Sequence, residues 1–184
     1  MKIYIIERDI EKFKYLVPYF DNLENVILIN SDFKICMQKY DIQCIVSPAN
    51  SFGIMTGGYD KAIIDYFGKN VQNKVQNYIK NNYNKEQPVA TSFIIDIDNN
   101  KKLIHTPTMR IPKRIKDERI IYRCMKATLL IAIQNNIQSI LIPLFGGSTG
   151  RVHPDVIAQL MKEAYNEVYV YNQEIENEYI KRLK

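Results

Sequence analysis

Residues 47–67 read SPANSFGIMTGGYDKAIIDYF, and this stretch predicts a strand, a loop and a helix in that order. The apolar run 44–46 ends at Pro48, and a polar loop that contains glycine follows. Apolar side chains then recur at helical spacing, at Ala62, Ile63, Tyr66 and Phe67. Gly68 comes directly after them and is expected to end the helix.

Two glycines, Gly57 and Gly58, lie just before the predicted helix, where backbone N–H groups have no partner within the helix. Such a helix N-terminus binds anions through these donors and through the positive end of the helix dipole. Glycine lets a phosphate approach the backbone closely. A plain turn from strand to helix is the alternative, and the two glycines alone favour it. Asn50 at the strand end and Asp60 in the first helical turn favour a ligand site.

The same residues resemble the first ligand loop of the macro domain family. That family's pattern is close to Val-Asn-Ala-Ala-Asn, a short spacer, Gly-Gly-Gly-Val and a helix start, and this chain has Ser47-Pro-Ala-Asn50 and then Gly57-Gly-Tyr-Asp60. The Ser-Pro-Ala-Asn form with Phe-Gly behind it is most similar to a phage- and virus-associated branch. Macro domains bind ADP-ribose, and several hydrolyse ADP-ribosyl bonds or ADP-ribose 1″-phosphate. The resemblance extends over about residues 2–164 and implies the same ligand here.

The composition of the 184 residues is that of one globular domain, with 46% hydrophobic and 24% charged residues. No apolar stretch reaches the roughly 18 residues of a membrane span, and the N-terminus becomes charged too early for a signal peptide. Three scattered cysteines suggest reduced thiols in the cytoplasm, or in the host cytoplasm if the chain is viral. Two distant histidines argue against a zinc site, and we expect no metal and no cofactor.

The net charge of +5 suits an anionic ligand or a nucleic acid. Much of the positive charge lies in residues 101–126, for which a solvated helix face is the simpler interpretation. A protein that binds nucleic acid through this basic stretch is an alternative function, and its binding would depend steeply on salt.

Predicted strands alternate with predicted helices along the chain, which indicates an α/β fold. We expect a three-layer α/β/α macro domain-like fold with a mixed, mostly parallel central sheet of about six strands. The strands are predicted at 2–6, 25–30, 43–46, 90–97, 102–105 and 139–145. Helices are predicted at 13–20, 35–40, 59–67, 71–82, 118–136 and 154–164, of which 35–40 is a helix or a connector. Residues 1–172 are expected to form a single macro-like domain, and 173–184 a charged helical tail.

The strand at 25–30 is apolar throughout, so we expect it to be buried on both faces. Ser31-Asp32-Phe33-Lys34 comes directly after it, at the strand end where ligands bind to open α/β sheets. In macro domains a Gly-Asp-Ile-Thr follows the corresponding strand, and its Asp accepts a hydrogen bond from the adenine amino group. The resemblance therefore implies that Asp32 and Phe33 face the adenine. The alternative for a lone Asp after a strand is a helix N-cap.

A second glycine-containing loop, GGSTGR at 146–151, follows the last predicted strand. It lacks the Gly-Lys-Ser/Thr ending of a Walker A loop, which argues against an NTPase. It resembles the second macro domain loop, Gly/Ser-Thr-Gly-X-aromatic-Gly, so two helix N-termini would hold a diphosphate from both sides. Arg151-Val152-His153 departs from that pattern, because neither the aromatic residue nor the last glycine is present. Arg151 could compensate with its charge, and Phe52 or Tyr59 could supply the missing ring over the distal ribose.

Two further side chains follow the strand predicted at 102–105. A lone histidine at a strand end is usually a satisfied core residue, so a structural role is favoured for His105 over general base catalysis. Arg110 could reach a phosphate, although most arginines in loops are simply solvated.

The resemblance implies a set of substrate-binding residues: Asp32, Phe33, Ala49, Asn50, Gly57, Gly58, Tyr59, Gly147, Ser148, Thr149, Gly150 and Arg151. Asn50 and Asp60 are the candidate catalytic residues, because an amide would orient the ribose and a carboxylate would handle the attacking water. The first hypothesis is thus a hydrolase acting on mono-ADP-ribosylated substrates or on ADP-ribose 1″-phosphate. A catalytically silent reader of ADP-ribose is the second. The expected partner is ADP-ribose or an ADP-ribosylated protein or nucleic acid, with no membrane involved.

Overall fold

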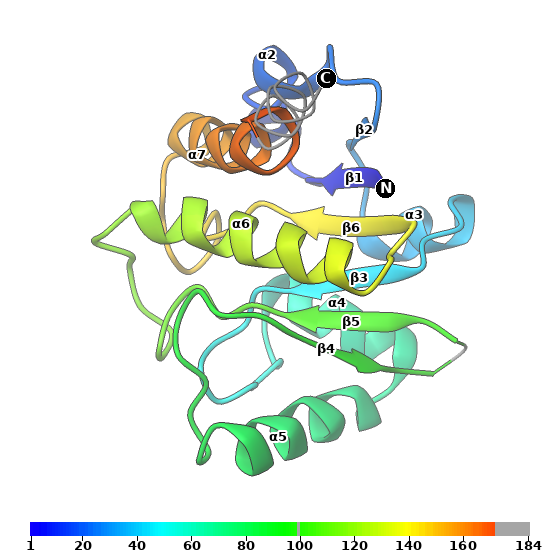
Figure 1. The fold of residues 1–184 in the computed structure, drawn as a ribbon, viewed down its shortest axis with the longest axis vertical. Helices are drawn as coiled ribbons and strands as arrows, with labels where there is room; N and C mark the ends of the chain where they lie inside the picture. The colour runs from blue at the N-terminus through cyan, green and yellow to red at the C-terminus, as the bar shows by residue number, and fades with distance from the viewer. Residues whose placement is uncertain (99, 172–184) are drawn as a thin grey trace, which may run out of the picture.

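A computed structural model describes residues 1–98 and 100–171, in which six strands form one sheet (Figure 1). The strands are β1 (Lys2–Ile6), β2 (Val26–Ile29), β3 (Cys44–Ser47), β4 (Phe93–Asp96), β5 (Lys102–His105) and β6 (Ser139–Pro143). Their order across the sheet is β2-β1-β6-β3-β5-β4. Every neighbouring pair is parallel except β4 and β5, which form an antiparallel hairpin. The expected mixed, mostly parallel sheet is therefore confirmed.

Helices cover both faces of this sheet, which gives the three-layer α/β/α arrangement expected from the sequence. They are α1 (Ile10–Phe13), α2 (Val17–Phe20), α3 (Phe33–Lys39), α4 (Gly58–Phe67), α5 (Asn70–Asn82), α6 (Arg119–Gln134) and α7 (Pro154–Asn166), followed by the π-helix η1 (Glu167–Tyr171). In Figure 1, α6 lies in front of the sheet and α4 behind it.

Each strand supplies both layers of the core, because successive side chains of a strand point to opposite faces. In β1, Ile3 and Ile5 pack with α2, α6 and α7, whereas Tyr4 and Ile6 pack with α3, α4 and α5. In β3 the same alternation places Val46 in the first cluster and Ile45 in the second. Two hydrophobic cores thus hold the sheet between its helices.

The N-terminal region differs from the prediction in two respects. The expected helix at 13–20 is two short helices, α1 and α2, since Pro18 in the first turn of α2 has no N–H with which to continue a helix from α1. Both faces of β2 are packed as expected, since Val26 and Leu28 join one core and Ile27 and Ile29 the other, but Ile27 and Leu28 are only half-buried. The reason is its place at the edge of the sheet, where only β1 flanks it.

Two segment boundaries also follow from local structure. The strand expected from residue 90 begins at Phe93, because Ala90 has a positive φ of 61° and its N–H donates to the carbonyl of Pro107. The charged tail 173–184 and the domain boundary at 172 lie outside the described residues, so both stay predictions.

Three observations concern side chains over the described part of the chain. Cys36, Cys44 and Cys124 are free and buried. Across residues 1–98 and 100–171, no His, Cys, Asp and Glu side chains gather in a group of three that could hold a metal ion. Over the same residues no helix is both long enough and apolar enough to span a membrane.

Candidate functional site

Two adjoining cavities lie where the parallel strands end. The central cavity, of about 320 Å³, is bordered by the loops after β3, β5 and β6. The β2-side cavity, of about 230 Å³, is bordered by the residues after β1 and β2. The two cavities share five lining residues, which are Gly58, Tyr59, Pro143, Leu144 and Ser148. Together they form one groove along the strand ends, of a size that suits a small ligand.

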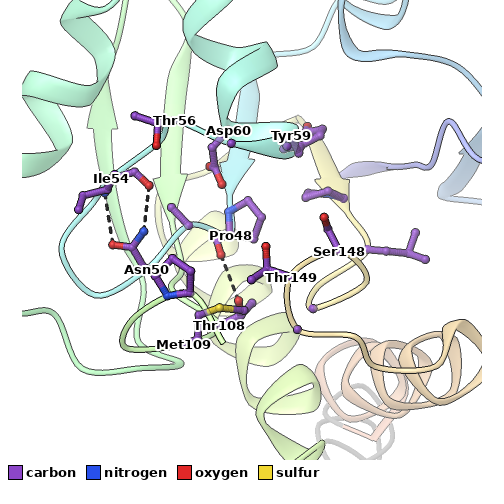
Figure 2. Close-up of a pocket in the computed structure, with 18 residues that line it drawn as sticks. Pro48, Asn50, Ile54, Thr56, Tyr59, Asp60, Thr108, Met109, Ser148 and Thr149 are labelled. Atoms are coloured by element: carbon purple, nitrogen blue, oxygen red, sulfur yellow. Dashed lines mark hydrogen bonds between the residues drawn. The ribbon is translucent and has the colours of Figure 1, made fainter. Parts of the chain in front are cut away.

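The first loop, residues 48–57, is held in shape by the side chain of Asn50. Its amide nitrogen donates to the carbonyl of Ile54 at 2.9 Å, and its amide oxygen accepts from the N–H groups of Phe52 at 3.1 Å and Ile54 at 3.4 Å. Helix α5 adds a further tie, because Gln72 accepts from the N–H of Met55 at 2.8 Å. Asn50 is buried and lines the central cavity, and Figure 2 shows its amide directed at Ile54, so the residue that holds the loop also lies at the groove.

A buried carboxyl group connects the two ends of this loop, because Asp60 follows the loop and its partner Ser47 precedes it. Asp60, in the first turn of α4, is 8% exposed, and its Oδ1 accepts a hydrogen bond of 2.6 Å from the hydroxyl of Ser47. Burial raises the pKa of Asp60 from 3.8 to about 7, although the hydrogen bond from Ser47 opposes this shift. In Figure 2 the carboxyl group is directed from α4 toward Pro48. The central cavity therefore contains a group that changes charge near neutral pH.

The second loop, residues 144–150, is shaped by missing side chains. A Cβ atom on Gly150 would lie 2.6 Å from the carbonyl oxygen of Gly146 and 2.7 Å from Cδ1 of Ile115. The backbone is fixed at the same place, since the N–H of Ile115 donates to the carbonyl of Gly150 at 2.9 Å. In Figure 2 the hydroxyl groups of Ser148 and Thr149 point toward the first loop. The two loops thus face each other across the central cavity.

The sequence matches a family model over residues 46–161, which is more than half of the chain, and that model describes the Macro domain. This chain belongs to the macro domain family. An uncharacterized protein of Aquifex aeolicus (strain VF5) is 28% identical over 127 residues, which cover 68% of this chain and 73% of that protein.

Solved macrodomain structures share the fold. The macrodomain of Mycobacterium tuberculosis DarG has a TM-score of 0.60 and 18% identity, over 71% of this chain and 85% of that one. The Oceanobacillus iheyensis macrodomain with MES bound has a TM-score of 0.62 and 20% identity, over 71% of each chain. A mutant of the same macrodomain, solved with ADPR, has a TM-score of 0.62 and 19% identity, over 71% of this chain and 73% of that one. The resemblance to a phage- and virus-associated branch stays a prediction.

Most residues that the sequence suggested for this macro domain line the groove. Those at the central cavity are Ala49, Asn50, Gly57, Gly58, Tyr59, Asp60, Ser148, Thr149 and Gly150. Those at the β2-side cavity are Asp32, Phe33, Gly58, Tyr59, Gly147 and Ser148. Gly57 lines only the central cavity and Gly147 only the β2-side cavity, a division that the sequence alone did not predict. Arg151 lines neither cavity, and it is exposed with a positive φ of 52°.

Of the two residues expected at the adenine, Asp32 is exposed and Phe33 is buried. Asp32 is exposed and caps α3, because its side chain accepts from the N–H of Ile35 at 3.2 Å. Phe33 is only 3% exposed and packs edge-on against the ring of Tyr59. The N-cap alternative for Asp32 is thus observed, and it leaves the carboxylate accessible at the β2-side cavity.

The residues that depart from the family pattern after Gly150 pack in the core and cap a helix. Val152 is buried in the core against Gly146, and His153 caps α7 by accepting from the N–H of Asp155. Of the two rings considered as a replacement for the missing aromatic residue, Tyr59 lines both cavities. Phe52 instead lies beneath the guanidinium of Arg110, whose Cζ is 5.3 Å from the centroid of the Phe52 ring.

Two other residues weighed from the sequence have structural partners. His105 is fully buried, and its Nδ1 lies 2.6 Å from Oε1 of Gln87. Burial lowers the pKa of His105 to about 3, so the ring is neutral and the structural interpretation is the observed one. Arg110 forms a two-bonded ion pair with Glu86, at 2.6 and 2.9 Å, and does not line the central cavity.

Sequence reasoning missed the partner of Asp60 and one wall of the central cavity. Ser47 begins the quoted motif, yet nothing in the sequence pairs it with a residue 13 positions later. Thr108 and Met109 form the wall after β5, and Met109 pairs with Asn50 in an isolated bridge. At the end of β5, sequence reasoning considered His105 and Arg110 and passed over this wall between them, although ligands lie beyond such strand ends.

Proposed function

We propose that this macro domain binds ADP-ribose along the groove and hydrolyses the bond between the distal ribose and an attached group. The observation that carries the proposal is Asp60, a buried carboxyl with a pKa of about 7, set between two glycine-containing loops. The family supports the choice of ligand, and a mutant of the Oceanobacillus iheyensis macrodomain has been solved with ADPR.

The order of side chains along the groove supports one direction for the ligand. Asp32 lies at the β2-side cavity and suits the adenine amino group as a hydrogen-bond acceptor. The backbone around Gly58 and Ser148, shared by both cavities, suits the diphosphate. The distal ribose then lies in the central cavity beside Asn50 and Asp60, with its reactive carbon toward the β5 side.

The proposed reaction is attack of water on C1″ of the distal ribose. Asp60, once ionised, takes a proton from the water, the new C–O bond forms, and the bond to the attached group breaks. The leaving group departs with a proton from solvent. Ser47 uses Oδ1 of Asp60, so the other carboxylate oxygen acts as the base. The second N–H of the Asn50 amide holds a ribose hydroxyl. A base placed in this way contributes about 10²- to 10⁴-fold in rate.

A cytoplasmic location is part of the same proposal. It is supported by three cysteines that are free and buried, with thiol pKa values raised by burial. Reduced thiols are normal in that compartment.

The experiment compares binding and turnover in wild type and Asp60→Asn. Calorimetry with ADP-ribose is expected to give similar Kd values, within about threefold. Single-turnover release of ADP-ribose from a mono-ADP-ribosylated protein is expected to slow about 10²- to 10⁴-fold in the variant. Asp65→Asn is the matched control, since Asp65 is an exposed carboxylate on the same helix.

Each outcome has a distinct meaning. Binding without turnover in wild type makes the chain a silent reader of ADP-ribose. Undiminished turnover in Asp60→Asn removes Asp60 as the base. Absence of ADP-ribose binding in wild type contradicts the whole proposal.

A further inference from the structure

A third cavity, of about 330 Å³, lies under the loop between β5 and α6. Its interior is apolar and is formed by Val89, Ile115 and Ile120 together with Met109. Arg110, Lys113, Arg114 and Lys116 surround it, so we call it the basic cavity. The proposed hydrolysis does not use this cavity.

The charges around the basic cavity are not balanced. Arg110 is paired with Glu86, and Asp117, the one acidic lining residue, is paired with Arg123. Within the described part of the chain, no carboxylate lies at ion-pair distance from Lys113, Arg114 or Lys116. All three are exposed. Three unpaired cations around an apolar hollow attract an anionic partner that also carries an apolar group.

The basic cavity adjoins the groove at its central cavity. Thr108 and Met109 line both it and the central cavity, so one wall separates them. The three cavities also follow the order of the sheet. The β2-side cavity borders β2, β1 and β6, and the central cavity borders β6, β3 and β5. The basic cavity borders β5 and the residues before β4, because Val89 precedes β4 at the same edge. A ligand with its adenine at β2 therefore directs its attached group toward the basic cavity.

We propose that the basic cavity binds an acidic peptide segment of the target protein, with one apolar side chain inserted and flanking carboxylates on the three cations. Charge complementarity selects an anionic partner. The lining selects a peptide over single-stranded nucleic acid, because none of the described lining residues is aromatic and base binding relies on aromatic stacking. That this peptide carries the ADP-ribose rests on the proposed function, whereas the docking site itself does not.

Fluorescence anisotropy with a labelled peptide of sequence EEDLEED tests the docking site directly. We expect saturable binding that weakens at least tenfold when the central leucine is replaced by serine, in EEDSEED, because the apolar anchor is lost. The double variant Lys113→Glu/Arg114→Glu is expected to weaken binding of EEDLEED by about tenfold or more. Lys69→Glu/Lys80→Glu, at and within α5, makes the same change in net charge outside all three cavities and is expected to have a much smaller effect.

Three results would overturn the inference. Equal binding of EEDLEED and EEDSEED would show attraction to a basic surface without a docked side chain. An equal loss in the two double variants would show that net charge alone matters. Tighter binding of a short oligothymidylate, lost in Lys113→Glu/Arg114→Glu, would assign the cavity to nucleic acid instead.

Titration of free ADP-ribose on the same proteins separates this inference from the proposed function. Both double variants are expected to bind ADP-ribose as wild type does, since neither pair lines the groove. Failure of wild type to bind ADP-ribose would contradict the proposed function and leave the peptide result standing. Failure of the peptide alone would contradict only the docking site.

Discussion

The two loops that face each other across the central cavity differ in the contacts that dominate. The first is held chiefly by the three hydrogen bonds of Asn50 and by Gln72 of α5, although Gly53, with a φ of 65°, also packs against Val75 with no room for a Cβ. The second loop needs the absence of side chains at two glycines. Gly146 packs against the side chains of Ile115 and Ile121, and Gly150 packs against the backbone of Gly146. The loss of one side-chain hydrogen bond lowers the stability of a loop by a small amount. A Cβ placed against a backbone atom, as at Gly150, lowers it by much more.

Gly150→Val is expected to have the largest effect. The new Cβ would lie 2.6 Å from the carbonyl oxygen of Gly146, a backbone atom that cannot move aside easily. We expect the free energy of unfolding, measured in urea, to fall by more than about 4 kcal/mol. Gly57→Val is the control in the first loop, because nothing lies within 4 Å of a Cβ there and φ is −136°. Similar losses in the two variants would contradict the distinction between the loops.

The second prediction concerns the charge that closes the first loop. The carboxyl of Asp60 has a pKa of about 7 when folded against 3.8 as its ordinary value. Below about pH 4 the carboxyl is protonated in the folded and in the unfolded chain, so its burial does not lower the free energy of unfolding through ionisation. As the pH rises to about 7 the unfolded chain ionises first, and the stability of wild type should fall relative to Asp60→Asn by about 1.4 kcal/mol per pH unit. Above about pH 7 the difference should be constant.

Ser47→Ala sharpens this test. The hydrogen bond from Ser47 opposes the rise in the pKa of Asp60, so its removal should raise that pKa further. The fall in stability, and the rise in activity that depends on ionised Asp60, should then both extend to higher pH. Ser51→Ala is the matched control, since Ser51 is equally buried and its hydroxyl has no partner among the described residues. An unchanged pH profile in Ser47→Ala would contradict the role of the pair.

Asn50→Ala should cost less, about 2 kcal/mol of stability, because it leaves buried backbone groups of the first loop without partners. ADP-ribose binding should weaken as well, since the loop lines the central cavity. Asn82→Ala, which removes one exposed amide hydrogen bond at the end of α5, should change stability by less than about 0.5 kcal/mol. Equal effects would mean that the first loop is held by its backbone after all.

Arg151→Ala is expected to have the smallest effect. Its side chain is exposed and lines neither part of the groove, although it directly follows the second loop. Calorimetry should give the wild-type Kd for ADP-ribose within about twofold, and stability should change by less than about 0.5 kcal/mol. A clear loss of affinity would show that the arginine reaches the diphosphate when ligand is bound.

Much of the fold could be predicted because its signals are local. The short apolar run of β1 and the helical spacing after Gly58 each indicate one element, and the glycines mark the loops after β3 and β6. The site was less predictable where it depends on distant contacts. No local pattern places Ser47 against Asp60, or shows that Arg151 turns away from the groove. Pro18 indicates a break between two helices, but the apolar residues around it keep the spacing of one helix, so a single helix at 13–20 was predicted.

The position of Ile115 links two sites that the chain keeps apart. Its side chain lines the basic cavity, and the same Cδ1 atom lies where Cβ atoms on Gly146 and Gly150 would collide with it. A peptide that displaced Ile115 would change the packing of the second loop, and with it the affinity of that loop for a diphosphate. Thermodynamic reciprocity would then require ADP-ribose to change the affinity for the peptide by the same factor. One aliphatic side chain would make recognition of a target and of its modification a single cooperative event.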